Sequence, residues 1–298
     1  MRYFSDEDVC IEYVARLRWP NGPVCPACGG TEIIYLASRR VWKCKAKDCK
    51  KQFSVKKGTI FEQSPLGLDK WLPGLWLIAN SKNGVSSHEV ARALGITQKS
   101  ARHLLHRCRE ALRDGTFELL DGTIEVDETF IGGKVDNKHA SKRPPKGSSI
   151  GGAGKTIVVG ARQRGGKARA RVVPDRTSKT LMRFVTTNVD PGAQVYTDEA
   201  SAYFYLRWDG YKHATVTHSK GEYVRGSIST NGVENLWSLL KRSIHGTYVQ
   251  VAPEHLSRYV DERTFAYNLR ERTDLERFET ALAQSVGRRL TWAQLTET

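Results

Sequence analysis

The spacing of apolar residues changes along the chain, and each spacing predicts a different kind of element. In four segments apolar side chains recur every three or four positions, as on the buried face of a helix: 5–18, 68–79, 87–94 and 97–112. After residue 122 the pattern changes to short runs in which apolar and polar positions alternate, which is typical of strands. The chain is therefore expected to begin with helices and to continue with a sheet.

Two close pairs of cysteines interrupt the first helical part. Cys25 and Cys28 form one pair, and Cys44 and Cys49 form the other. The segment between the pairs alternates like two short strands. Two such pairs can deliver four thiolates to one tetrahedral Zn²⁺, and a site filled by four protein ligands is structural and not catalytic. The first sixty residues therefore predict a zinc ribbon.

Residues 87–102 predict a helix, a turn at Gly95 and a second helix capped by Thr97. This spacing is typical of a DNA-binding helix-turn-helix, although a generic three-helix packing unit has the same pattern. If the unit binds DNA, the start of the second helix faces base edges and phosphates. The residues placed there are Gln98, Lys99, Ser100 and Arg102.

The remaining elements are predicted in the order three strands, helix, strand, short helix, strand and long helix. The strands are expected at 122–131, 156–161, 168–173, 194–198 and around 215–218, and the helices at 178–188, at 200–206 and from Asn231 onward. This order matches the mixed sheet of the RNase H-like fold. In that fold the first strand, the end of the fourth strand and the last helix converge at one edge of the sheet. The fold class is therefore multidomain α/β, with a zinc ribbon and an all-α helix-turn-helix preceding an RNase H-like domain.

Acidic residues occupy all three of those converging positions: Asp127, Asp198 and Glu234. Carboxylates are the ligands that Mg²⁺ prefers, and two such ions can stabilise both the entering and the leaving oxygen in phosphodiester displacement. Asp127 and Asp198 each have a second acid beside them, Glu128 and Glu199, and the strand alternation does not decide between the members of each pair. The sequence predicts a metal-dependent centre for cutting or joining DNA.

A basic residue follows the third acid on the same helix. Lys241 comes seven residues after Glu234, which places both on one helical face. Lys241 can therefore contact a substrate phosphate, and a plain surface salt link is the alternative.

The charge of the chain points to a polyanionic partner. Its formal net charge is +15, which favours nucleic acid, although a merely basic soluble protein is the alternative. Basic residues gather in the ribbon and in a Gly- and Pro-rich stretch after the first strand, and the DNA contacts expected there are Arg39, Arg40, Lys43, Lys142 and Arg143. No apolar run approaches the ~18 residues that span a membrane, and the first residues lack the order of a signal peptide. A cytoplasmic, nucleoid-associated protein is expected.

Together these motifs resemble the bacterial insertion-sequence DDE transposases that are related to the eukaryotic Merlin elements. The resemblance spans nearly the whole chain and is most specific in Ile124–Lys134, Tyr196–Tyr203 and Thr230–Lys241. The 35 residues between the second and third acids equal the gap that names the D-D-35-E transposases and integrases.

The resemblance also assigns roles to individual residues. It implies that Asp127 and Asp198 are the first two catalytic acids and that Lys241 is the basic residue that follows. The third position varies between Asn and Glu in this family, so Asn231 and Asn235 stay as candidates beside Glu234.

The function implied by the resemblance is DNA transposition. The protein would bind double-stranded DNA at the terminal inverted repeats of its own element, as a homodimer. With two Mg²⁺ or Mn²⁺ ions it would cleave DNA and join the freed 3′-hydroxyl to target DNA. The alternatives are a domesticated, non-catalytic DNA-binding regulator and a metal-dependent nuclease that cuts without joining. The expected domains are an N-terminal helix with the ribbon (1–62), the helix-turn-helix (63–118), the catalytic domain (119–272) and a C-terminal tail (273–298).

Overall fold

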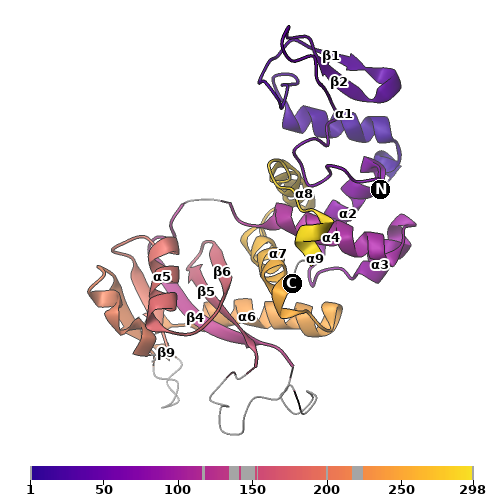
Figure 1. Cartoon of the computed structure of the whole chain (residues 1–298). Coiled ribbons are helices and arrows are strands. Elements are labelled where there is room, and N and C mark those ends of the chain that lie inside the picture. The colour runs from indigo at the N-terminus through magenta and orange to yellow at the C-terminus, as the bar shows by residue number, and fades with distance from the viewer. Residues whose placement is uncertain are drawn as a thin grey trace. The chain divides into compact units, whose positions relative to one another are not determined.

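The chain folds into two compact units. The computed structural model describes residues 2–115, 118–133, 141, 152, 154–198, 201–216 and 224–296. One unit is Met1–Arg113 with Glu271–Thr298, and the other is Asp114–Arg270. In Figure 1 the first unit runs from indigo to magenta and is completed by the yellow end of the chain. Among the described residues no helix is long and apolar enough to cross a membrane.

The first unit begins with a short 3-10 turn (η1, Arg2–Ser5), a helix and a three-stranded antiparallel sheet. Asp6 caps the helix α1 (Glu7–Arg18) by accepting hydrogen bonds from two backbone amides. The strands are β1 (Ile33–Leu36), β2 (Val41–Cys44) and β3 (Gln52–Phe53), with a 3-10 turn (η2, Ala37–Arg39) after the first. Trp42 lies against Trp19 and Phe53, with ring centroids 5.2 and 6.5 Å away. These rings give so small a sheet its apolar core.

Three helices follow the ribbon: α2 (Leu68–Asn80), α3 (Ser87–Leu94) and α4 (Gln98–Leu112). Ser86 and Glu89 form a capping box at the start of α3, and Thr97 caps α4. Gly95, which ends α3, has a φ of +64°, a left-handed conformation that glycine adopts without strain. The helix, glycine turn and helix expected from the sequence are therefore present.

The C-terminal segment also belongs to the first unit. It forms α8 (Asp274–Ala283) and α9 (Trp292–Thr296). The ring of Phe278 is fully buried between Tyr13 and Trp76, and the Tyr13 hydroxyl donates to Glu279 Oε1 at 2.7 Å. Within the stretch 273–298, which the sequence predicts to be a C-terminal tail, α8 thus packs into the core of this unit. The many charges around Phe278 hide this apolar helix face in the sequence.

A five-stranded mixed sheet forms the second unit, in the order β6-β5-β4-β7-β8. β4 (Thr123–Ile131) pairs antiparallel with β5 (Thr156–Gln163), which pairs with β6 (Ala168–Val173). β7 (Gln194–Thr197) and β8 (Lys212–Thr215) run parallel to β4. The predicted RNase H-like mixed sheet is confirmed. A small hairpin of β9 (Val224–Arg225) and β10 (Ile228–Ser229) precedes the late helix.

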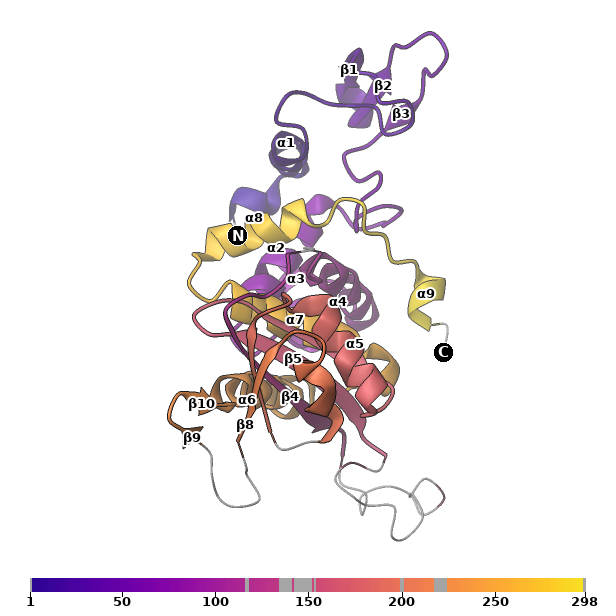
Figure 2. The same cartoon turned by 90° about the vertical axis from the view of Figure 1, so that its left-hand side faces the viewer.

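Helices cover both faces of this sheet (Figure 2). One face carries α5 (Ser178–Asn188) and the 3-10 helix η5 (Ser201–Arg207), and Ile124 and Val126 of β4 lie in this core. The other face carries α6 (Asn231–Ser243) and α7 (Leu256–Asn268), and Ile131 of β4 lies in that core. The π-helical turn η7 (Ile244–Tyr248) and the 3-10 turn η8 (Pro253–His255) connect the two helices. Successive residues of β4 therefore point to different helices.

The last strand differs from its predicted position. It was expected around residues 215–218, but β8 ends at Thr215, and Thr217 and His218 lie outside the described residues. β8 pairs with β7 from Gln194 opposite Lys212 to Thr197 opposite Thr215. Its sequence, Lys-His-Ala-Thr, does not alternate apolar and polar residues. This strand therefore forms because its backbone pairs with β7 at the edge of the sheet, and the side-chain pattern does not reveal it.

Candidate active site

Asp127 and Asp198 lie at the same level on neighbouring strands. β4 and β7 are parallel, with Glu125 opposite Tyr196. Two residues beyond this pair, Asp127 still lies within β4, and Asp198 directly follows the end of β7. Because hydrogen-bonded strands lie about 4.8 Å apart, this register brings the two carboxylates together at one edge of the sheet.

The two neighbouring acids on β4 point to opposite faces. Trp237 Nε1 of α6 donates a hydrogen bond to Asp127 Oδ2 at 2.9 Å, so Asp127 faces α6. Glu128 accepts a hydrogen bond from the Tyr203 hydroxyl, which lies in the core beneath α5. Burial raises the pKa of Glu128 to about 8, with further contributions from the charges of Asp127 and Asp198. This raised pKa favours the neutral form of Glu128, whereas Asp127 lies on the face of β4 that α6 covers.

The pKa of Asp127 is also raised, to about 6. Burial is the largest cause, and the charge of Asp198 comes second. Glu234 raises this pKa as well, whereas the hydrogen bond from Trp237 lowers it. Like charges held near one another favour protonation or a bound cation. The negative charges of these neighbouring carboxylates therefore favour a bound cation.

Glu234 lies in the first turn of α6. Its Oε1 accepts a hydrogen bond from Thr230 Oγ1 at 2.9 Å, and its backbone amide donates to the Thr230 carbonyl. The two asparagines that compete with it for the third position, Asn231 and Asn235, are exposed. The charge of Glu234 acts on Asp127, which favours the glutamate as the third acid. Lys241, two turns further along α6, is exposed.

A buried carboxylate that the sequence reading missed ties α6 to the sheet. Glu125 of β4 accepts a hydrogen bond from the Val233 backbone amide at 2.9 Å. It also pairs with Arg164 at 2.8 Å and with Arg162 at 3.4 Å. Because Val233 precedes Glu234, this network fixes the start of α6, which carries Glu234, relative to β4. In the sequence, the signal for this role is that Glu125 is a charged residue two positions before Asp127 and so points to the same face of the strand.

Glycine is required where α6 meets the sheet. Gly160 of β5 is paired directly with Asp127, and a Cβ there would lie 2.8 Å from Trp237 Cζ2 and closer still to Cη2. The indole therefore comes close to the backbone at the glycine, and this close approach lets Nε1 reach Asp127. Gly232, at the start of α6, is similarly crowded by Arg162 and Glu125.

Replacing Gly160 with alanine is expected to lower the free energy of unfolding by about 1–3 kcal/mol, because Trp237 must move away from a packed position. Thermal unfolding followed by circular dichroism measures the change. Gly246→Ala is the matched control, since a Cβ at that position meets no atom within 4 Å. Equal unfolding temperatures for the two variants would contradict the packing argument.

The cysteine pairs of the ribbon converge as zinc ligands do. The four Sγ atoms lie within 4.8 Å of one another, with Cys25–Cys49 and Cys28–Cys44 both at 3.7 Å. Tetrahedral Zn²⁺ with Zn–S bonds of about 2.3 Å places its sulfurs about 3.75 Å apart. The cluster fits structural zinc.

The three acids are less tightly gathered than the thiolates. Among the described residues, the cysteine cluster is the one group of three or more His, Cys, Asp or Glu side chains whose donor atoms lie close enough to share a metal ion. Asp127, Asp198 and Glu234 nevertheless offer only oxygen donors, the set that hard divalent cations prefer. Their chemistry fits Mg²⁺ or Mn²⁺.

Two family profiles match the chain. The ISXO2-like transposase domain covers residues 119–268, which is 150 of the 298 residues, and the transposase zinc-ribbon domain covers residues 5–52. The chain belongs to the ISXO2-like transposase family. The predicted insertion-sequence transposase and its zinc ribbon are thereby confirmed, and the relation to Merlin elements stays a prediction.

One curated relative of this transposase is an uncharacterised protein in transposable element ISH50 of Halobacterium salinarum. It is 28% identical over 254 residues, covering 81% of this chain and 84% of that protein. Among solved structures, the pre-cleavage Mos1 transpososome is 11% identical over 71% of this chain and 78% of that chain, with a TM-score of 0.21. The Mos1 strand transfer complex is 11% identical over 72% and 78%, with a TM-score of 0.20. These TM-scores carry no argument about fold or function.

The residues that the sequence predicts to contact DNA differ in their surroundings in the transposase. Gln98, Lys99 and Arg102 are exposed at the start of α4, where Gln98 Nε2 donates to Ser87 Oγ at 2.8 Å, and Ser100 is half-buried. In the ribbon, Arg40 forms two hydrogen bonds with Asp8, at 2.7 and 2.8 Å. Arg39 Nη1 donates to Gln52 Oε1 at 3.4 Å, and Lys43 is half-buried on β2. Lys142 and Arg143 lie outside the described residues.

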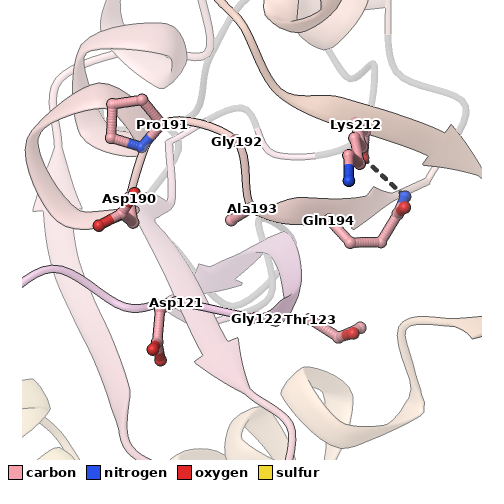
Figure 3. Close-up of a pocket in the computed structure, with 9 residues that line it drawn as sticks. All are labelled: Asp121, Gly122, Thr123, Asp190, Pro191, Gly192, Ala193, Gln194 and Lys212. Atoms are coloured by element: carbon pink, nitrogen blue, oxygen red, sulfur yellow. Dashed lines mark hydrogen bonds between the residues drawn. The ribbon is translucent and has the colours of Figure 1, made fainter.

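A cavity of about 480 Å³ in the transposase lies away from the acids. It is lined by the segment that enters β4, including Asp121, by the loop between α5 and β7, including Asp190, and by Lys212 of β8 (Figure 3). β4 starts here at Thr123, and Asp127 comes four residues later, about 13 Å along the strand. The cavity therefore lies at the end of the sheet where β4 begins, and the candidate centre lies further along the strands.

Proposed function

We propose that this transposase cleaves DNA at the terminal inverted repeats of its element and joins the freed 3′-hydroxyl to target DNA. The observation that carries the proposal is the shared level of Asp127 and Asp198 on parallel strands, with Glu234 on the helix that covers them. Bound Mg²⁺ or Mn²⁺ ions would supply charge stabilisation for the entering and leaving oxygens.

The chain's own residues would hold the ions and the DNA. Asp127, kept in place by Trp237, would share a cation with Asp198 on one side and with Glu234 on the other. Because protons and cations compete for Asp127, ion binding should strengthen as the pH rises through the pKa of about 6. Lys241, exposed on α6, would contact a substrate phosphate.

DNA recognition would come from the first unit. The exposed Gln98, Lys99 and Arg102 at the start of α4 suit base edges and phosphates in the major groove. The ribbon would add phosphate contacts from basic residues such as Arg39 and Lys43. Arg40 contributes less in this proposal, because Asp8 already neutralises its charge.

A regulator without catalysis and a nuclease without joining are the competing functions. Both fit the same fold and charge. The charge interaction between Asp127 and Asp198 favours an intact catalytic centre over a regulator, because retained mutual repulsion serves no purpose in a protein that only binds DNA. Cutting and joining use one metal centre, so only the reaction products separate the transposase from the nuclease.

The experiment is a product analysis with the purified full chain. Duplexes carrying the element ends are incubated with supercoiled target DNA, with and without Mg²⁺, and the products are separated on denaturing gels. Mg²⁺-dependent joined products are expected. Cleaved ends without joined products would replace the proposal by the nuclease, and DNA binding without either product would replace it by the regulator. We expect a homodimer because two ends must be held together, and a mass measurement that finds one chain per complex on the same samples would contradict this.

A further inference from the structure

The 3-10 helix η5 (Ser201–Arg207) presents a cluster of aromatic side chains to solvent. Phe204, Tyr205 and Trp208 are 62%, 57% and 68% exposed. Their ring centroids lie 5.0 to 5.6 Å from one another. Large aromatic side chains are usually covered, so three adjacent exposed rings mark a binding surface. We call Phe204, Tyr205 and Trp208 the aromatic platform.

The platform stands on a fixed base. Tyr203 and Leu206, which alternate with the exposed rings, are completely buried in the core of the second unit. Ser178 Oγ at the start of α5 donates to the Ala202 carbonyl at 2.7 Å. The Trp208 backbone amide donates to the Tyr205 carbonyl at 3.0 Å. The exposed rings are thus held in place by buried neighbours and do not belong to a loosely attached loop.

The platform follows Asp198, one of the candidate catalytic acids, closely along the chain. η5 begins three residues after Asp198. The hydroxyl of Tyr203, in the first half of η5, donates to Glu128 and so fixes η5 against β4, on the face opposite to that of Asp127. A DNA strand that extends from Asp198 toward η5 can therefore reach these rings.

Basic side chains accompany the rings. α5 packs along η5 and, in its eleven residues, carries exposed Lys179 and Arg183 and no acidic residue. Arg207 of η5 is exposed as well. An aromatic surface with adjacent positive charge matches a nucleic-acid strand, in which bases present flat π-faces and phosphates carry negative charge. A second apolar protein surface would gain nothing from these charges.

We propose that the aromatic platform stacks on unpaired bases of the DNA strand that enters the catalytic centre. This inference rests on the proposed function for the place of that strand. The stacking is independent of base identity, since every base has a π-face, and it would hold the end open next to the phosphate that reacts. Loss of one stacking contact typically weakens binding about five- to a hundredfold.

The test compares two DNA ends in buffer without Mg²⁺, so that no cleavage occurs. One probe is a blunt duplex, and the other has the same sequence with a short unpaired end that contains 2-aminopurine. Binding is followed by anisotropy of a fluorescein label on the duplex, and stacking by quenching of the 2-aminopurine. Full-length wild type should quench the analogue, and Trp208→Ala should lose the quenching and bind the open end at least about fivefold more weakly. Binding of Trp208→Ala to the blunt duplex should stay within about twofold of wild type.

Two variants and one further measurement keep the test sharp. Trp208→Phe keeps a ring and should retain the quenching. Tyr3→Ala removes a ring that is equally exposed but lies in the first unit, and should leave both probes unaffected. Unchanged quenching in Phe204→Ala/Trp208→Ala, or equal weakening on both probes, would overturn the inference. It would likewise be overturned if these substitutions changed only the mass of the protein in solution, which would assign the platform to a second copy of the chain.

The outcome is separable from that of the proposed function. Quenching that depends on Trp208, in a protein that makes no joined products, would leave the stacking site in place and remove the transposition reaction. If the protein makes joined products but the double variant quenches as well as wild type, the transposition reaction stands and the stacking site is ruled out.

Discussion

Replacing Asp198 with asparagine should abolish cleavage and joining together while leaving DNA binding at the wild-type level. Asp198 lies level with Asp127 across two parallel strands, and its charge is the second-largest cause of the raised pKa of Asp127. Neutralising it removes one ligand of the proposed metal centre, which costs several kcal/mol of transition-state stabilisation. The reaction rate should fall on the order of a thousandfold or more.

The same assay decides the third acid. Glu234→Gln should cause a loss as large as that of Asp198→Asn, whereas Asn235→Ala, on the next residue of α6, should stay within a few-fold of wild type. Asp190→Asn is the control for the loss of an acid far from the centre, because Asp190 lines the cavity at the end of the sheet where β4 begins. Strand-transfer rates and anisotropy with end-containing duplexes are measured on each variant. If Glu234→Gln stays active and an asparagine variant is inactive, that asparagine and not Glu234 is the third catalytic residue.

Removing zinc should unfold the ribbon. Cys44 is fully buried and its sulfur lies 3.7 Å from that of Cys28, so Cys44→Ser takes away one of four closely packed ligands. Structural zinc contributes about 10–16 kcal/mol of apparent binding free energy in zinc-finger peptides, far more than a three-stranded sheet with a few aromatic rings can replace.

Metal analysis by mass spectrometry should find about one zinc per wild-type chain and none in Cys44→Ser. The variant should also lose the dispersed amide signals of the ribbon in a nuclear magnetic resonance spectrum. Cys108→Ala is the control, because Cys108 is buried in α4 and outside the cluster. One equivalent of zinc in Cys44→Ser would contradict the four-thiolate site.

The sequence predicts the elements whose pattern is local. Cysteine spacing identifies the ribbon, and caps such as Ser86 and Thr97 mark the ends of helices, because these signals depend on neighbours a few residues away. The choice between Asp127 and Glu128 is of another kind. It depends on which helix covers each face of β4, and the hydrogen bonds with Trp237 and Tyr203, which show this, join residues far apart in the sequence.

Features that arise from pairing between distant segments escaped the sequence. Glu125 looks like an ordinary strand acid, but its value to the site comes from Arg164, which is 39 residues away, and from the Val233 amide, which is 108 residues away. β8 is defined by pairing with β7 despite its polar sequence. Phe278 is one apolar residue among charges until α8 packs against Tyr13 and Trp76.

The place of α8 has a consequence during synthesis of the protein. The first unit is interrupted by Asp114–Arg270 and is completed only by residues from Glu271 onward. A ribosome must therefore finish the entire second unit before Phe278 can fill the core between Tyr13 and Trp76. A nascent or prematurely terminated chain lacks this part of the core, so the complete first unit would form only in molecules that already carry Asp127, Asp198 and Glu234.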